Sequence, residues 1–179
     1  SAPTVYYPEI NNTVQITYTA PNATATANIM DCDIAEVYGG TGALCVVMAG
    51  STDQPNAYFW NGQTSIAMDP TYFPMTQYQL AGDARDRITA FGKQQGYLII
   101  FKERSIGRTS VETETVDERL TIDLAYVAIN AKIGCDLPST IQLIENNLTW
   151  CNTQNGVHFL ANTSSAYENN VVNISHKVN

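Results

Sequence analysis

The stretch ITAFGKQQGYLIIFKERSIGRTSV, residues 88–111, predicts three short β-strands in succession. ITAF (88–91) and LIIFK (98–102) are rich in β-branched and aromatic residues, and SIGRTSV (105–111) follows the polar turn Lys102-Glu103-Arg104-Ser105. Short apolar runs bounded by turn residues are typical of antiparallel strands. We therefore interpret residues 88–111 as neighbouring strands of one sheet.

The same order of strands recurs on both sides of this stretch. IAEV (34–37) and IQLI (141–144) align with ITAF at offsets of 54 and 53 residues. The second strand of each unit is LCVVMA (44–49), LIIFK (98–102) or LTWCN (148–152), and the third is AYFWN (57–61), SIGRTSV (105–111) or GVHFLA (156–161). The fourth strand is predicted at TSIAM (64–68), LTIDLAYVAI (120–129) and VVNISHKV (171–178).

Four strands in about 50 residues, repeated three times, are typical of β-propeller blades. The sequence therefore predicts an all-β chain of four-stranded antiparallel meander repeats, forming a partial or full β-propeller of about three blades. The predicted blades span 34–69, 88–129 and 141–178, within a single domain or as part of a larger propeller. Residues 1–33 are predicted to be an N-terminal extension with one strand, TVQITYT (13–19). A β-sandwich of twelve unrelated short strands is the alternative.

The repeat predicts equivalent positions in the three units. Ile34, Ile88 and Ile141 should occupy the same place on the first strand, and Leu44, Leu98 and Leu148 should all be buried. Three blades form an open arc, so the outward faces of its first and last blades should be as apolar as the interior. The chain could belong to a longer propeller, pair with a second copy, or cover one end with residues 1–33. We expect the first of these, with self-association of the isolated chain.

A family resemblance rests on two stretches. DPTYFPMTQYQLAGDARDRITAFGKQQGYLIIFKERSIGR (69–108) contains a Y-F-P segment, a Gly-Asp turn, an I-T-x-F strand and a strand ending in F-K-E. IGCDLPSTIQLIENNLTWCNTQNGVHFL (133–160) contains I-G-C, a Pro-Ser turn and a hairpin ending in G-V-x-x-L, and ISHKV (174–178) closes the unit. These features resemble the β-propeller structural proteins of tailed-phage and prophage virions.

The resemblance implies a non-enzymatic structural protein of the virion tail or neck, assembled in the bacterial cytoplasm. Its partners would be other virion proteins or further copies of itself. A possible interaction surface combines aromatic residues near prolines with part of a local basic patch; its members are Tyr72, Phe73, Tyr78, Arg104 and Arg108. A carbohydrate-binding or glycan-processing module of a tail spike, a secreted lectin, and an extracellular adhesion domain are the alternatives.

Charge and hydropathy exclude two classes of partner. Residues 1–84 contain seven carboxylates and no Lys or Arg, and the whole chain has a net charge of −8. Because affinity for nucleic acid requires cations at the phosphates, binding over a broad face is not expected. The longest apolar run, ALCVVMAG (43–50), is far shorter than the roughly 20 residues of a membrane-spanning helix. The first residues also lack the pattern of a signal peptide.

Residues able to perform catalysis or bind metal are few. His158 and His176 are the two histidines, and no G-x-S-x-G motif accompanies them. Two acidic clusters could support glycoside hydrolysis or bind calcium, but we interpret them as hydrogen-bond acceptors in turns; they comprise Asp31, Asp33 and Glu36, and Asp83 and Asp86. The four cysteines form no C-x-x-C pair and are expected to be free thiols in a reducing compartment. The sequence therefore predicts neither an enzyme nor a cofactor.

Overall fold

A computed structural model describes residues 4–7, 12–15, 31–40, 42–62, 70, 72–74, 76–116, 119–163 and 170–175. The chain is all-β, since every described regular element is a strand except the one-turn 3-10 helix η1 (Pro138–Thr140). The strands form three four-stranded antiparallel sheets and two separate hairpins. The predicted all-β class and the three antiparallel meander units are therefore confirmed.

The three sheets repeat one strand order. The first sheet contains β3 (Ile34–Tyr38), β4 (Cys45–Ala49), β5 (Ala57–Trp60) and β6 (Tyr78–Leu80). The second contains β7 (Ile88–Gln94), β8 (Tyr97–Lys102), β9 (Ile106–Thr109) and β12 (Val127–Asn130). The third contains β13 (Gln142–Ile144), β14 (Asn147–Asn152), β15 (Gly156–Leu160) and β16 (Val171–Asn173). In each sheet every strand pairs with the next, and a hairpin of β10 (Glu112–Val116) and β11 (Arg119–Asp123) is inserted between β9 and β12.

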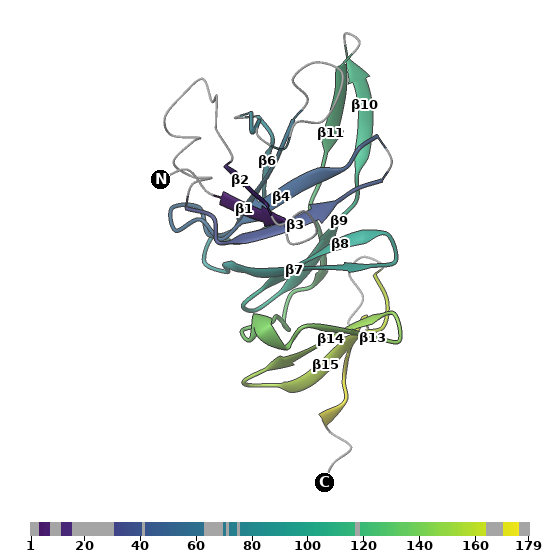
Figure 1. Cartoon of the computed structure of the whole chain (residues 1–179). Helices are drawn as coiled ribbons and strands as arrows, with labels where there is room; N and C mark the ends of the chain where they lie inside the picture. Colours follow the sequence, from purple (N-terminus) through teal and green to yellow (C-terminus); the bar gives the residue numbers. More distant parts are fainter. Residues whose placement is uncertain are drawn as a thin grey trace.

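The sheets are stacked in chain order along the length of the molecule (Figure 1). The first sheet lies above the second, the third lies at the lower end, and the β10–β11 hairpin projects upward beside the first sheet. Contacts join β3 to β7, the first strands of the first and second sheets, and β7 to β14, the second strand of the third sheet. Among the described residues the stack is open and the sheets do not close into a ring.

Two type I′ turns set the register of the first hairpin in the second and third sheets. Gln95 and Gly96 have φ angles of 52° and 81°, and Glu145 and Asn146 have 48° and 64°. Both central residues of a type I′ turn require positive φ, and its twist matches that of the paired strands. The turns therefore place Gln94 opposite Tyr97 and Ile144 opposite Asn147.

The fourth strand differs from the sequence-based prediction in the first two units, whereas β16 begins at the predicted Val171. The fourth strand of the first sheet is β6 (Tyr78–Leu80), whereas the predicted strand at 64–68 lies outside the described residues. The run 120–129 is divided between β11, in the inserted hairpin, and β12, which completes the second sheet. The N-terminal extension contains two paired strands, β1 (Thr4–Tyr7) and β2 (Asn12–Gln15), and not the single one expected.

The predicted equivalence of three buried leucines holds for two of them. Leu98 and Leu148 are buried, but Leu44 is 55% exposed because β4 begins one residue later, at Cys45. Leu44 lies in the connection before β4, and Gly39, which follows β3, has a φ of 118°. Cys45 therefore takes the buried position at the start of the strand.

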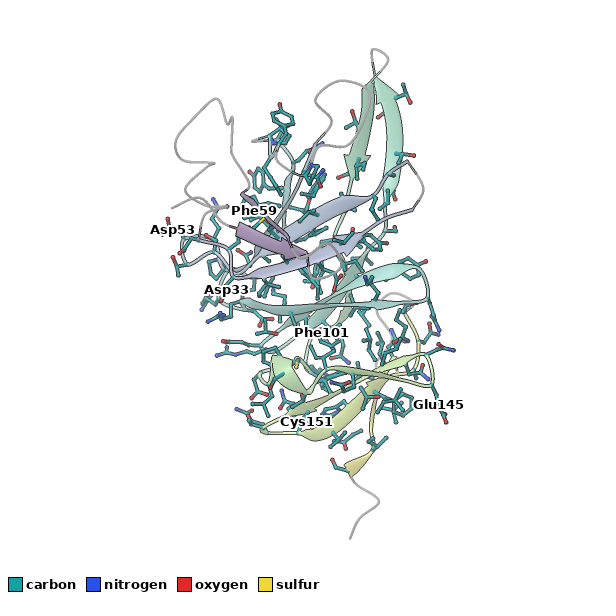
Figure 2. All side chains as sticks on the ribbon, in the orientation of Figure 1. Asp33, Asp53, Phe59, Phe101, Glu145 and Cys151 are labelled. Carbon is teal, nitrogen blue, oxygen red and sulfur yellow. The ribbon has the colours of Figure 1, made fainter. Side chains whose placement is uncertain are left out.

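Apolar layers hold the stack together. Between the first and second sheets lie residues such as Val47, Tyr58, Leu98 and Ile100, together with Ile122 of the inserted hairpin. Between the second and third sheets the apolar layer consists of Ile99, Phe101, Ile106, Ile129, Cys135, Leu148, Trp150, Leu160 and Val171. Figure 2 shows Phe101 within this second layer. Each sheet thus contributes alternate residues to the layer that it faces.

Buried polar side chains connect neighbouring sheets. The Tyr38 hydroxyl donates to the carbonyl of Thr109 in the second sheet, and Trp60 Nε1 donates at 3.0 Å to the carbonyl of Ile122 in the inserted β10–β11 hairpin. Gln94 lies between the second and third sheets, where its amide donates to the Leu160 carbonyl and accepts from the Leu148 amide. Because an unpaired polar group would be costly in these layers, the bonds fix the position of one sheet on the next.

Candidate functional site

The acidic residues belong mainly to turns. Asp31 precedes β3 and accepts hydrogen bonds from the amide and hydroxyl of Thr52, which lies between β4 and β5. Asp136 precedes β13 and accepts the same two bonds from Thr153, which lies between β14 and β15. These bonds lower the pKa of both carboxyls. Each acid therefore clamps the segment before the first strand of its sheet to the turn between the second and third strands.

Asp86 makes the corresponding clamp in the second sheet. It accepts from the Arg104 amide at 2.8 Å and from the Ser105 hydroxyl. Its carboxylate also lies 3.5 Å from the ammonium of Lys102, and both side chains are almost entirely buried. Lys102 Nζ donates in addition to the carbonyls of Ala81 and Asp83. The three clamps agree with the interpretation of these acids as turn acceptors.

Asp83 and Asp86 have separate partners in the structure. Asp83 is exposed and accepts from the Arg85 amide at 2.9 Å, which lowers the pKa of its carboxyl. Asp86 is engaged by Lys102 and the β8–β9 turn. Among the described residues no group of three or more His, Cys, Asp or Glu side chains is placed to hold a metal ion.

His158 lies in the layer between the second and third sheets, while His176 lies outside the described residues. The imidazole is fully buried beside Trp150, with ring centroids 5.8 Å apart, and neither ring nitrogen has a hydrogen-bond partner. Burial lowers the pKa of His158, and the nearby backbone of Asn155 offsets part of that shift. The ring is thus an uncharged core residue without contact with solvent.

The five residues of the predicted interaction surface lie in three different places. Phe73 is 2% exposed and packs against Met48 and Phe59 on the outer side of the first sheet, so it contributes to the core. Tyr72 is partly exposed, and Tyr78 is exposed and stacks on Phe59. The two arginines lie on the second sheet, and the structure does not bring them together with the aromatic residues.

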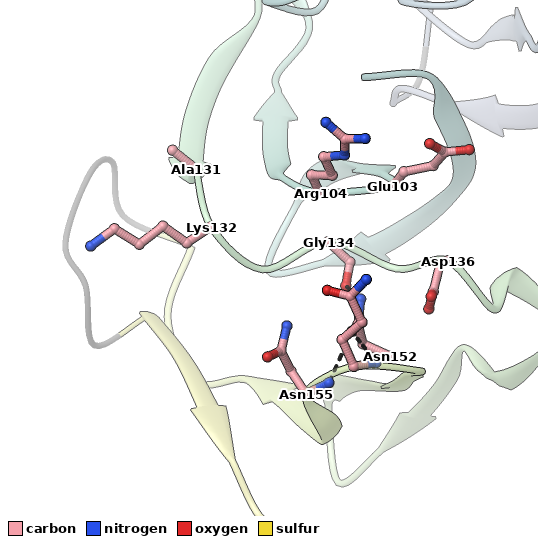
Figure 3. A pocket seen from close by; sticks show the side chains of 9 residues that line it. Glu103, Arg104, Ala131, Lys132, Gly134, Asp136, Asn152 and Asn155 are labelled. Atoms are coloured by element: carbon pink, nitrogen blue, oxygen red, sulfur yellow. Dashed lines mark hydrogen bonds between the residues drawn. The ribbon is translucent and has the colours of Figure 1, made fainter. Parts of the chain in front are cut away.

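Arg104 and Arg108 have different surroundings. The guanidinium of Arg108 lies 4.0 Å from the ring centroid of Tyr97, a cation–π contact on the side facing the third sheet. Arg104 lines a polar pocket of about 510 Å³ between the turn ends of the second and third sheets (Figure 3). Lys132, Gly134 and Asn152 also line this pocket.

Several polar groups that line this polar pocket already make hydrogen bonds within the chain. Asn152 donates to the Gly134 carbonyl and accepts from the amides of Gln154 and Asn155. Asp136 is held by Thr153. Figure 3 shows the side chains of Arg104 and Lys132 pointing in different directions. The residues that line the pocket include no aromatic ring on which a sugar could stack.

A second pocket, of about 600 Å³, lies between the ends of the β3–β4 and β7–β8 hairpins. Tyr38, Tyr97 and Val111 give it an apolar lining. The Tyr38 hydroxyl donates to the backbone carbonyls of Gly96 and Thr109. This pocket is therefore bounded by groups that hold the first two sheets together.

The edge of the first sheet beside this pocket is protected. The Val37 amide donates to the carboxylate of Glu36 at 3.0 Å, and its carbonyl accepts from Lys93 Nζ at 3.2 Å. Lys93 and Glu36 form an ion pair at 2.9 Å. Free backbone groups of an edge strand otherwise invite pairing with another chain, and a charged pair over them opposes it.

The outer face of the third sheet is the broadest candidate for a functional surface. We define this face by the residues that point away from the second sheet, namely Gln142, Ile144, Asn147, Thr149, Cys151, Val157, Phe159 and Val172. Strand register fixes the assignment, because Phe159 lies opposite Thr149 and Val172, whereas His158 lies opposite the buried Trp150. Figure 2 labels Cys151 on this sheet.

This face is uncharged, mostly apolar, with Gln142, Asn147 and Thr149 as its polar members, and no other sheet covers it among the described residues. Ile144 is 55% exposed and Val172 36% exposed, while Cys151, Val157 and Phe159 are partly exposed. On the second sheet, by contrast, the residues that point toward the following sheet are fully buried; they are Ile99, Phe101 and Ile106. The third sheet thus carries an apolar face of the same kind without a fourth sheet against it among the described residues.

Sequence reasoning alone did not identify this surface. β14 and β15 carry apolar residues on both faces, as NLTWCN and GVHFL show, and this is the signal that could have identified it. The same pattern also occurs in β8, which is buried on both sides.

The comparisons with known proteins add no family to this description. No family model matches the chain, and no curated protein matches it. In the described part of the chain no helix is long and apolar enough to cross a membrane.

Proposed function

We propose that this chain is a non-enzymatic structural protein that acts through protein–protein contacts in an assembly. The observation that carries the proposal is the outer face of the third sheet, which exposes apolar side chains and has no other sheet against it among the described residues. Exposed contiguous apolar surface is unusual on a soluble domain unless it is a binding site. Asp31, Asp86 and Asp136 each clamp a turn in one of the three sheets. These repeated clamps agree with a structural role for the carboxylates.

We further propose that the three sheets are blades of a β-propeller type. The support is their common meander order, the face-to-face packing of neighbouring sheets through apolar layers and the repeated carboxylate clamp. Together with the resemblance of 69–108 and 133–160 to virion proteins, this favours a component of a phage or prophage tail or neck. The assembly would form in the bacterial cytoplasm.

Glycan binding has weaker support from the geometry. Sugar sites commonly combine an accessible aromatic ring with convergent polar groups. The polar pocket lacks the ring, and the ring of Tyr97 is already in contact with Arg108. A glycan array on the isolated chain provides a direct comparison: reproducible binding of one glycan class would favour the receptor function over assembly.

The proposal is tested by titrating the chain with a dye that fluoresces on apolar surfaces. We expect binding by the wild-type chain and its loss in Phe159→Asp, since the charge would lie within the outer face. Leu80→Asp is the matched control, because Leu80 is 48% exposed on β6 and lies outside this face. Equal dye binding by all three proteins would contradict the assignment of the surface. Peptides of the chain in gradient-purified phage particles would test the virion assignment.

A further inference from the structure

We propose that the outer face of the third sheet binds the same face of a second copy of this chain, giving a symmetric dimer joined end to end. The inference rests on the proposed function, because it names the partner of the same surface. It goes further by fixing both the identity of the partner and the direction of the contact.

Continuity of the stack gives the first argument. The layer between the second and third sheets is formed by two apolar sheet faces packed on one another, with the Phe101 ring set edge-on to Trp150 at 5.2 Å. The outer face of the third sheet offers the same kind of surface at the end of the stack. Its natural partner is therefore another apolar sheet face and not a single extended strand or a charged surface.

The opposite end of the stack offers a different face: Tyr78 and Leu80 are exposed at its edge, opposite Phe59 and Ala57, but its centre is covered. On the outer side of the first sheet, Met48, Ala57 and Phe59 are buried, and Phe73 of the same chain packs against them. A second copy arranged head to tail would have to displace Phe73 to reach these residues. Among the described residues, the third sheet is thus the end sheet whose outer face has no cover at its centre, and two such faces of the same kind pair symmetrically.

The distribution of charge gives an independent argument for the direction. Residues 1–84 carry seven carboxylates and no base, whereas residues 133–179 carry three carboxylates and one lysine. Two copies joined through their third sheets keep the two strongly acidic parts at opposite ends. The eight outer-face positions include no charged residue, so the contact itself brings no like charges together.

Sedimentation velocity on the full chain tests the inference. We expect a dimer for wild type, and a monomer for Phe159→Asp and for Val172→Lys. Phe159 and Val172 are both partly exposed, so neither change is expected to unfold the chain, and circular dichroism with a thermal melt checks this. Leu80→Asp should remain a dimer.

Photo-cross-linking fixes the geometry of the contact. A benzoylphenylalanine in place of Phe159, in a mixture of ¹⁴N- and ¹⁵N-labelled chains, should join peptides of β14–β16 from two different copies. Cross-links from position 159 to peptides of the first sheet would overturn the symmetric arrangement. A dimer that Leu80→Asp breaks, and that Phe159→Asp and Val172→Lys leave intact, would overturn the surface as well.

The two proposals fail in distinguishable ways. A wild-type monomer at every concentration, with dye binding that Phe159→Asp abolishes, would overturn the second-copy inference and leave the proposed binding surface in place. A wild-type monomer with equal dye binding in all variants would overturn both.

Discussion

At the scale of single residues, the stack depends on a few buried polar groups as well as on apolar packing. Lys102 is buried with Asp86, and together they connect the segment after the first sheet to the turn of the second. Such a pair is stabilising only while both partners are present, because the remaining charge would otherwise be buried without compensation. His158 is a different case, since burial of its ring lowers its pKa by more than the nearby backbone of Asn155 raises it.

Neutralising Asp86 should therefore destabilise the chain strongly. We expect Asp86→Asn to lower the free energy of unfolding by about 3–5 kcal/mol, because Lys102 loses its counter-charge in a buried position. Urea denaturation followed by circular dichroism measures the change. Asp83→Asn is the control, since Asp83 is exposed, and a denaturation midpoint that Asp86→Asn shifts no further than Asp83→Asn does would contradict this role for the pair.

His158 predicts a pH dependence with a definite sign. Its pKa is lowered in the folded chain from the ordinary histidine value of about 6.5 in the unfolded chain. Between these two values the unfolded state binds the proton, so stability is full above pH 6.5 and declines as the pH falls toward the folded pKa. Denaturation at pH 7.5 and 5.5 should show this loss in wild type. A His158→Leu chain that retained the whole pH difference would rule out His158 as its source.

At the scale of elements, the sequence predicted the first three strands of each unit and the start of β16 close to their observed positions, and it failed on the fourth strand of the first two units. The first three strands are apolar enough on at least one face to stand out, as CVVMA and YLIIFK do. The short β6, YQL, follows β5 after a long connection, and β12 follows an inserted hairpin, so periodicity alone did not identify either one. Leu44 shows the same limit of sequence alignment. The repeat placed it on the second strand, whereas β4 begins at Cys45 and leaves Leu44 in the preceding connection.

The candidate surface was predicted less well than the strands. An aromatic residue near a proline, such as Phe73, has the same sequence signature whether it packs inward or faces a partner. Residues on the outer face of β15 become distinctive only when the third sheet is known to be the end of the stack. The position of the third sheet at the end of the stack is a property of the tertiary arrangement, and a local sequence pattern does not encode it.

Alanine substitutions of the three aligned leucines test whether these leucines occupy equivalent positions in their sheets. Leu98→Ala and Leu148→Ala should each lower the free energy of unfolding by roughly 2–5 kcal/mol, since both remove buried methyl groups and leave a cavity. Leu44→Ala should have little effect, because its side chain is mostly exposed. Chemical denaturation of the three variants provides the comparison, and equal losses in all of them would show that Leu44 is buried as the repeat alone suggested.

At the scale of the whole molecule, one strand order repeated three times produces a stack with two unequal ends. At the first end Phe73 covers Met48 and Phe59, with Tyr78 and Leu80 exposed at the edge, and the second end presents the uncharged outer face of the third sheet. The sheet faces that pack against one another inside the stack are alike. The two ends therefore differ in the residues that lie on the outer faces of the first and third sheets. This asymmetry is the basis of both the assembly function and the end-to-end dimer.

Small-angle X-ray scattering over a concentration series tests this account most directly, because it reports mass and length together. The account predicts forward scattering for twice the 19.6 kDa of the chain, with a maximum dimension close to double that of the single stack. In Phe159→Asp both quantities should return to those of one chain. A wild-type mass of 19.6 kDa at every concentration, or a doubled mass without the increase in length, would contradict it.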